Sequence, residues 1–227
     1  GGRPHAETVA LAQAGAKAKD ATAYVTLEPC AHHGQTPPCA DALIAASVSR
    51  VVVAATDPDP RVNGGGLSRL KAAGLEVTTG VCAKTAHDDN AGFMSRVSKG
   101  RPFVTLKLAS SLDGRIATAT GESKWITGPD ARRMVHAMRS NHDAVMVGAG
   151  TARADDPSLT VRDLGVDHQP VRVVVSRHVE VPRSGVLART ATQTPVWLIH
   201  GEDADAQRVQ DWEKLGARLL PCEIGAD

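Results

Sequence analysis

Short apolar segments alternate with segments that favour helix, and this alternation limits the possible folds more than any other feature of the sequence. Val51–Ala55 is a continuous apolar run of strand length, typical of a strand buried on both faces. Asp57–Pro60 breaks the run. A helical segment at 67–73 then ends at Gly74 and leads into a second short strand at 75–79. Strands separated by helices form largely parallel sheets, so the sequence predicts an α/β fold.

The same pattern runs along the whole chain and is interrupted once, at Gly100-Arg101-Pro102. With 227 residues and 42% hydrophobic content, two domains are expected, 1–100 and 101–227. The first domain is expected to hold helices at 5–19, 39–47, 67–73 and 83–99, with strands at 23–27, 51–55 and 75–79. The second is expected to hold strands at 103–109, 144–147, 171–175, 196–199 and 217–220, with helices at 130–140 and 206–215.

Composition argues against several classes of partner. The net charge is +1, and Lys and Arg are spread along the chain, so a nucleic-acid surface is not indicated. Aromatic residues make up only 3% of the chain, which argues against a stacking platform for single strands. No apolar run approaches the length of a membrane span. The four cysteines lack the spacing of a disulfide scaffold and favour a reducing compartment.

Four residues form a candidate metal-dependent site: His5, Glu7, Cys30 and Cys39. A catalytic zinc ion takes three protein ligands and leaves one position for water, and His5, Cys30 and Cys39 supply three. Zinc lowers the pKa of that water, and a carboxylate must then carry protons to the leaving amine. Glu7 is the candidate for this role. The order H-x-E…P-C is that of zinc deaminases acting on nucleobases, so the sequence predicts a deaminase.

The loop between the two cysteines leaves one point open. His32 and His33 either contact the substrate or belong to an ordinary polar loop, and the polar loop is the favoured interpretation. A purely structural zinc site would need a fourth ligand, which only these two histidines offer. Cys39 follows Pro37-Pro38 at the start of a helix, and the helix N-terminus is expected to favour its thiolate.

The spacing of the cysteines departs from the commonest deaminase pattern, P-C-x-x-C. The loop here is Pro29-Cys30-Ala31-His32-His33-Gly34-Gln35-Thr36-Pro37-Pro38-Cys39, preceded by Thr26-Leu27-Glu28. This stretch resembles the bifunctional deaminase/reductase family of riboflavin biosynthesis. Segments 106–115, 121–127 and 150–162 look like parts of that family's reductase domain, so the resemblance covers essentially the whole chain.

The resemblance implies a cytidine deaminase-like three-layer domain followed by a dihydrofolate reductase-like α/β domain. It implies zinc-dependent hydrolytic deamination of 2,5-diamino-6-ribosylamino-4(3H)-pyrimidinone 5′-phosphate. The ribosyl side chain of the product would then be reduced to ribityl, with hydride from NADPH. It further implies a cytoplasmic enzyme and a homodimer formed through the reductase domain.

The resemblance also assigns reductase residues by position. Ala109, Trp125, Thr151, Asp155 and Ser176 match the NADPH-binding positions, and Ser123, Arg139, Leu159 and Arg162 match the substrate-binding positions. Arginine suits a phosphate-bearing substrate. Without the resemblance, the two arginines indicate solvated surface charge and Trp125 a core residue. Lys107 either lines the reductase pocket or is a charge at a strand edge.

The resemblance also implies that both domains are truncated. The family has strands and a helix ahead of the His-x-Glu motif, and further strands with a glycine-rich phosphate-binding segment beyond residue 227. The chain begins at Gly1-Gly2-Arg3-Pro4 without an initiator Met. This stretch is therefore expected to show impaired deamination and little or no reduction. Turnover equal to that of the full-length protein would contradict the expectation.

Three alternatives stay open. The first is a zinc deaminase of another nucleobase or nucleoside, for which the expected basic or aromatic interleaving is missing. The second is a non-catalytic zinc-stabilised binding module, against which Glu7 beside an open three-ligand site argues. The third is a reductase with a vestigial deaminase domain, against which the intact ligand set argues.

Overall fold

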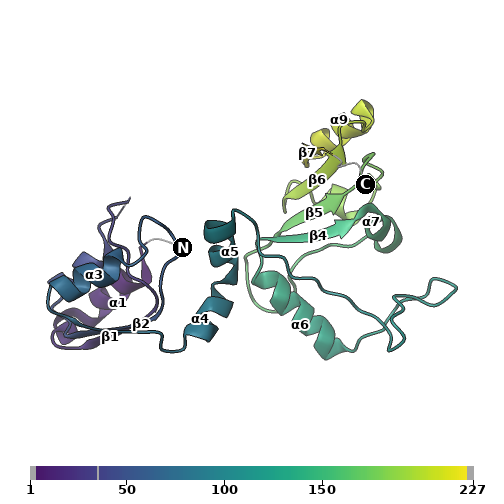
Figure 1. Cartoon of the computed structure of the whole chain (residues 1–227). Helices are drawn as coiled ribbons and strands as arrows, with labels where there is room; N and C mark the ends of the chain where they lie inside the picture. Colours follow the sequence, from purple (N-terminus) through teal and green to yellow (C-terminus); the bar gives the residue numbers. More distant parts are fainter. Residues whose placement is uncertain (1–3, 35, 224–227) are drawn as a thin grey trace. The chain divides into compact units, whose positions relative to one another are not determined.

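The chain forms two compact units, Gly1–Lys107 and Leu108–Asp227, in a computed structural model that describes residues 4–34 and 36–223. Gln35 of the cysteine loop and the residues at both chain ends lie outside these ranges. Each unit contains its own parallel sheet, with strand order β1-β2-β3 in the first and β4-β5-β6-β7 in the second (Figure 1). In the described residues, no helix is both long enough and apolar enough to cross a membrane.

The first unit follows the expected alternation closely. Its elements are α1 (Ala6–Ala14), η1 (Gly15–Ala18), β1 (Thr22–Leu27), α2 (Cys39–Ala45), β2 (Arg50–Ala55), α3 (Gly65–Ala72), β3 (Glu76–Thr79), α4 (Ala83–Asp89) and α5 (Ala91–Lys99). The helix expected over 5–19 ends as a 3₁₀ turn at Gly15–Ala18. The helix expected over 83–99 is divided at Asn90.

The central strand β2 explains the continuous apolar run that the sequence displays. Val51 and Val53 are fully buried on one face, in a core shared with Leu43 of α2 and Leu70 of α3. Val52 is also buried, and because side chains alternate along a strand it faces the opposite side. Helix α4 contacts β2 as well. Helices on both faces of the sheet give the three-layer arrangement.

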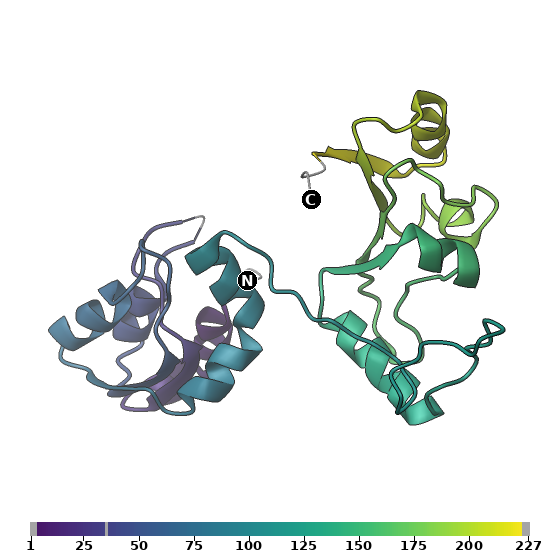
Figure 2. The same cartoon turned by 45° about the vertical axis from the view of Figure 1, so that its right-hand side comes forward.

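The second unit is built on four parallel strands. Its elements are α6 (Pro129–Ser140), β4 (Ala144–Gly148), α7 (Ala149–Asp155), β5 (Val171–Val175), α8 (Val186–Arg189), β6 (Val196–Gly201), α9 (Ala206–Lys214) and β7 (Arg218–Cys222). Its core holds Val174, Leu198 and the fully buried Trp212 of α9. Helix α7 contacts β4 and β5, and α9 contacts β7 (Figure 2). Helices α7 and α8 were not expected from the sequence.

The strand expected over 103–109 is wrong. This segment forms neither helix nor strand, and its apolar side chains are exposed, Leu106 to 78% and Val104 to 79%. A strand needs a neighbour to which its backbone can hydrogen-bond, and neither sheet pairs with this segment in the described part of the chain. Lys107 lies within it, so it is not a charge at a strand edge.

Arg172, in the middle of β5, is fully buried, and within the described ranges it has no acidic partner. Its guanidinium donates to the carbonyl oxygens of Ser158, Thr190 and Thr194 and to the Thr190 hydroxyl. Burial lowers the pKa of this arginine. The side chain thus ties the loops at 158 and 190–194 to the central sheet.

Replacing Arg172 with Ala is expected to destabilise the second unit by about 3–5 kcal/mol, because the change opens a cavity and leaves buried carbonyl groups without donors. All three tryptophans lie in this unit, so their fluorescence during urea unfolding reports its stability. The matched control is Arg177→Ala, since the Arg177 side chain is 58% exposed and its replacement should cost less than about 0.5 kcal/mol. Equal unfolding midpoints for the two variants would contradict the structural role of Arg172.

Candidate active site

Three separate elements bring the predicted metal ligands together. His5 precedes α1, Cys30 follows β1, and Cys39 is the first residue of α2. His5 Nδ1 lies 3.2 Å from Cys39 Sγ and 3.7 Å from Cys30 Sγ, and all three ligand atoms lie within 4.8 Å of one another. A nitrogen and a sulfur bound to one tetrahedral zinc ion are about 3.6 Å apart, given ordinary bond lengths. The donor set and its spacing therefore fit zinc.

Backbone N–H groups in the first turn of α2 donate hydrogen bonds to Cys30. The Cys39 backbone N–H donates to Cys30 Sγ at 3.3 Å, and the Ala40 N–H donates to the Cys30 carbonyl at 3.1 Å. Burial raises the pKa of the Cys39 thiol far above its usual range, and the neighbouring Glu7 and Cys30 raise it further. Both effects oppose the influence of the helix end, which was expected to favour the Cys39 thiolate.

Glu7 lies in the first turn of α1, two residues after His5. Its carboxyl group acts on the pKa of Cys39 both through its charge and as a hydrogen-bond partner. The carboxyl group is therefore next to the cluster of ligand atoms. Helix α1 begins at Ala6, between His5 and Glu7. Because His5 is outside the regular helix, the spacing His-x-Glu places both side chains at the cluster. Within a regular helix, residues two apart would point to different faces.

A cavity of about 440 Å³ opens beside the ligand cluster. His5 and Cys30 form part of its lining, together with His32, His33, Gly34, Thr36 and Arg61. Neither His32 nor His33 joins the candidate ligand group in the described residues, so a zinc ion held by His5, Cys30 and Cys39 would keep its fourth position for water. The two histidines nevertheless line this cavity, whereas the sequence favoured an ordinary polar loop.

Sequence reasoning missed Arg61 as a residue of this cavity. Its guanidinium Nε lies 2.9 and 3.1 Å from the two carboxylate oxygens of Asp59, and this pairing holds the pKa of Asp59 well below its usual range. Its position in the chain could have indicated this role, because Arg61 lies shortly after the C-terminal end of β2. Ligand sites in parallel sheets gather outside the carboxyl ends of the strands.

The second unit brings together three of the four residues predicted to bind substrate. Arg139 of α6 donates to the Thr160 carbonyl at 3.0 Å, and the Arg162 N–H donates to His136 Nδ1 at 3.2 Å. Leu159 is buried in the same loop, with a left-handed φ of 55°. Burial, with the charge of Arg162, lowers the pKa of Arg139. The two guanidinium groups therefore share one region, as recognition of an anion requires.

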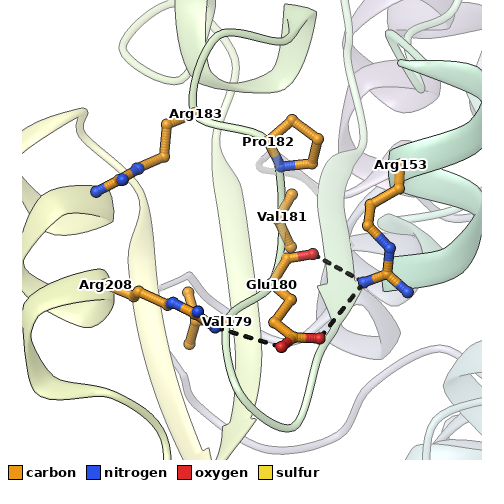
Figure 3. A pocket seen from close by; sticks show the side chains of 7 residues that line it. All are labelled: Arg153, Val179, Glu180, Val181, Pro182, Arg183 and Arg208. Carbon is orange, nitrogen blue, oxygen red and sulfur yellow. Dashed lines mark hydrogen bonds and ion pairs between the residues drawn. The ribbon is translucent and has the colours of Figure 1, made fainter.

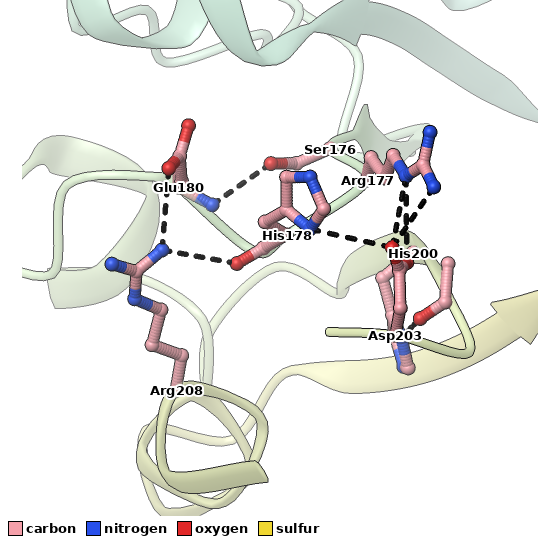
Figure 4. Close-up of polar contacts among 8 residues, drawn as sticks. Ser176, Arg177, His178, Glu180, His200, Asp203 and Arg208 are labelled. Atoms are coloured by element: carbon pink, nitrogen blue, oxygen red, sulfur yellow. Dashed lines mark hydrogen bonds and ion pairs between the residues drawn. The ribbon is translucent and has the colours of Figure 1, made fainter. Parts of the chain in front are cut away.

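The residues matched to NADPH fall into two groups. In the first group, Thr151 and Asp155 lie on α7 and Ser176 directly follows β5. Gly148 pairs with Val175, so β4 and β5 end side by side and these three residues follow the C-terminal ends of the two strands. Ser176 is buried, and its hydroxyl accepts a hydrogen bond from the Glu180 N–H at 2.9 Å (Figure 4).

The remaining predicted residues, Ala109, Ser123 and Trp125, lie in the segment between α5 and α6, which contains neither helix nor strand. Trp125 is 70% exposed and its ring lies 4.6 Å from Arg132 Cζ, so it is not the core residue that composition alone suggested. None of the contacts found in the described residues joins these three side chains to α7 or Ser176.

A second cavity, of about 490 Å³, is lined by Arg153, Arg183 and Arg208 together with Glu180 (Figure 3). Glu180 accepts from Arg208 at 3.4 Å through its carboxylate, and its backbone carbonyl accepts from Arg153 at 2.9 Å. Arg183 forms an ion pair with Asp211. Acidic groups thus already neutralise much of the positive charge around this cavity.

Comparison with known proteins agrees with both units. Residues 2–55 match the cytidine and deoxycytidylate deaminase zinc-binding region, and residues 102–223 match the RibD C-terminal domain. The chain is 48% identical to the riboflavin biosynthesis protein RibD of Escherichia coli strain K12, over 99% of this chain and 63% of that protein. It is 46% identical to RibD of Aquifex aeolicus, over 92% of this chain and 59% of that protein.

Solved structures give the same result. A structure of Acinetobacter baumannii RibD matches with a TM-score of 0.83 and 46% identity, covering 99% of this chain and 62% of that one. The Thermotoga maritima diaminohydroxyphosphoribosylaminopyrimidine deaminase/5-amino-6-(5-phosphoribosylamino)uracil reductase matches with a TM-score of 0.80 and 36% identity, covering 97% and 68%.

Fold and ligand set define a protein in which a deaminase-type zinc-binding unit precedes a RibD C-terminal unit. The chain belongs to the RibD family of riboflavin biosynthesis proteins. It spans about three fifths of the length of the curated relatives it matches.

Proposed function

We propose that this protein acts in riboflavin biosynthesis as a zinc-dependent deaminase of 2,5-diamino-6-ribosylamino-4(3H)-pyrimidinone 5′-phosphate and as an NADPH-dependent reductase of the deaminated product. The observation that carries the proposal is the convergence of His5, Cys30 and Cys39, with Glu7 beside them and a cavity open to the cluster. The membership of the chain in the RibD family supports the choice of substrate and of NADPH.

The residues of the first unit divide the work of deamination. His5, Cys30 and Cys39 would hold zinc, and zinc bound there would supply a water molecule of lowered pKa as the nucleophile. Glu7 accepts a proton from the attacking water and delivers it to the exocyclic nitrogen. The C–N bond then breaks, ammonia leaves, the oxygen from water remains on the ring as a carbonyl, and the second proton of water ends on the adjacent ring nitrogen. The cavity beside His5 and Cys30 receives the pyrimidine.

In the second unit, Arg139 and Arg162 bind the 5′-phosphate of the substrate, with Leu159 and Ser123 completing the substrate site. The adjacent guanidinium groups suit a phosphate because they donate charge-assisted hydrogen bonds in a fixed geometry. NADPH supplies the hydride that converts ribosyl to ribityl. Thr151, Asp155 and Ser176 would hold NADPH, with Ala109 and Trp125 contributing from the segment before α6.

We also propose domain limits of 1–100 and 101–227, a cytoplasmic location and a homodimer formed through the second domain. The match to the RibD C-terminal domain, which begins at residue 102, supports the boundary. All four cysteines are free thiols, as suits a reducing compartment. The homodimer is proposed from the family resemblance, and size-exclusion chromatography with light scattering tests it.

The test of the proposed function is mass spectrometry of the product formed from the diaminopyrimidine phosphate by the zinc-loaded full-length protein, with and without NADPH. Without NADPH, the substrate should lose its amine and release ammonia. With NADPH, the product should gain two further hydrogens. No change in either sample, from folded protein that contains zinc, would contradict the riboflavin assignment and leave a deaminase of another aminated ring.

A further inference from the structure

Glu28 is a buried carboxylate that neither binds the metal nor lines the cavity beside it. Its side chain is part of a residue only 3% exposed. One oxygen, Oε1, accepts from the backbone N–H groups of Gly66 at 2.9 Å and Leu67 at 3.2 Å. The other, Oε2, accepts from Gly64 at 3.0 Å and Asp57 at 3.4 Å. Four backbone N–H donors therefore converge on one carboxylate, two on each oxygen.

The chain around Glu28 is also fixed by close backbone packing. A Cβ atom added at Gly66 would lie 1.9 Å from the Pro29 carbonyl oxygen, so α3 rests directly against the residue between Glu28 and Cys30. At the neighbouring Gly65, an added Cβ would meet nothing closer than Ala31 Cβ at 3.7 Å. The contact between α3 and the segment 28–30 therefore depends on glycine at position 66 and not at 65.

Cys30 is held on its other side by α2, through the N–H groups of Cys39 and Ala40. The segment 28–30 is thus fixed between two helices, by Glu28 and Pro29 against α3 and by Cys30 against α2. Displacement of this segment would move Cys30 Sγ relative to His5 and Cys39. Groups that orient metal ligands change metal affinity when they are altered, even though they do not touch the metal.

We propose that Glu28 is a positioning residue for the zinc site, which fixes the place of Cys30 by anchoring the strand end of β1 to the start of α3. This inference rests on the proposed zinc site. It assigns to Glu28 no contact with substrate and no proton transfer.

The direct test is Glu28→Gln, which keeps the size of the side chain. The new amide NH₂ must face either the Gly66 and Leu67 donors or the Gly64 and Asp57 donors, so one pair loses its acceptor. Zinc affinity, measured by competition with a chromophoric chelator, is expected to fall roughly 10- to 100-fold. In the cobalt-substituted protein, the thiolate-to-metal absorption should weaken. The matched control is Glu76→Gln, an exposed glutamate of β3 that should leave both signals unchanged.

Two further comparisons separate positioning from loss of stability. Leu70→Ala removes packing from the core side of α3, so it should lower the unfolding midpoint and yet leave the zinc affinity and cobalt spectrum of the folded protein unchanged. Gly66→Ala should reproduce the effects of Glu28→Gln by pushing α3 away from Pro29, whereas Gly65→Ala should not. The glycine pair keeps the test available if Glu28→Gln does not fold.

Wild-type zinc affinity and an unchanged cobalt spectrum in Glu28→Gln, or in Gly66→Ala, would overturn the proposal. An equal loss of affinity in Leu70→Ala would also overturn it, since general destabilisation would then account for the effect. Failure of the proposed zinc site shows itself differently, because the unmodified protein would then bind no zinc at all, and the positioning role would fall with it.

Discussion

Replacing Glu7 with Gln is expected to slow deamination on the order of 10³-fold or more while the protein keeps its zinc. The amide has nearly the same shape as the carboxyl group, but it cannot accept the proton of the attacking water or return it to the leaving nitrogen. The ligands His5, Cys30 and Cys39 are untouched by the change. Ammonia release measured at saturating substrate, with zinc content determined by atomic emission on the same sample, checks both parts of the prediction.

The control for Glu7→Gln is Glu202→Gln, which alters an exposed glutamate of the second unit and should leave both turnover and zinc unchanged. A Glu7→Gln variant that retains wild-type turnover would remove Glu7 from the mechanism. The non-catalytic binding module predicts something else, namely no turnover in either protein and the same zinc content in both. Loss of zinc together with turnover would instead assign Glu7 a role in the metal site.

Replacing Cys39 with Ala is expected to abolish stable zinc binding, and deamination should fall to background. Only His5 and Cys30 would remain, and two protein ligands do not make a catalytic zinc site. Because a metal that binds only the folded state stabilises it, the wild-type chain should unfold at a higher temperature when zinc is added. That zinc-dependent rise should disappear in the variant. Zinc content after dialysis and thermal unfolding with and without zinc are the measurements.

Cys82→Ser provides the comparison for Cys39→Ala, since Cys82 is an exposed free thiol at the start of α4 and outside the ligand cluster. It should keep zinc, turnover and the zinc-dependent stabilisation. A Cys39→Ala protein that retains about one zinc ion per chain would show that another residue completes the site, with His32 or His33 the nearest candidates on the cavity wall.

Local sequence patterns were sufficient for most of the first unit and for the residues of its candidate metal site. The apolar run Val51–Ala55 predicts a strand buried on both faces because its composition leaves no polar face, and β2 has that burial. His5, Glu7, Cys30 and Cys39 were identifiable because zinc chemistry permits few residue types and needs a carboxylate nearby. The structure brings the three ligand atoms together from positions up to 34 residues apart.

Features that depend on distant contacts were not predictable in the same way. The alternation at 103–109 suggests a strand, but whether a strand forms depends on a partner that the local pattern does not encode. In the sequence, Glu28 is simply a polar residue at a strand end. Its burial is possible because four backbone N–H donors, 29 to 39 residues further along the chain, satisfy its carboxylate. Arg61 lines the cavity because the segment after β2 lies beside the cysteine loop, a distant contact that the local sequence does not encode.

Mass spectrometry of the product made in water enriched in ¹⁸O tests hydrolytic deamination at this site most directly. The zinc-loaded full-length protein should convert the diaminopyrimidine phosphate into a product in which one ¹⁸O atom replaces the exocyclic amine, and its Glu7→Gln variant should form almost none of it. A substrate that keeps its amine, in the presence of folded protein with zinc on His5, Cys30 and Cys39, would contradict the assignment.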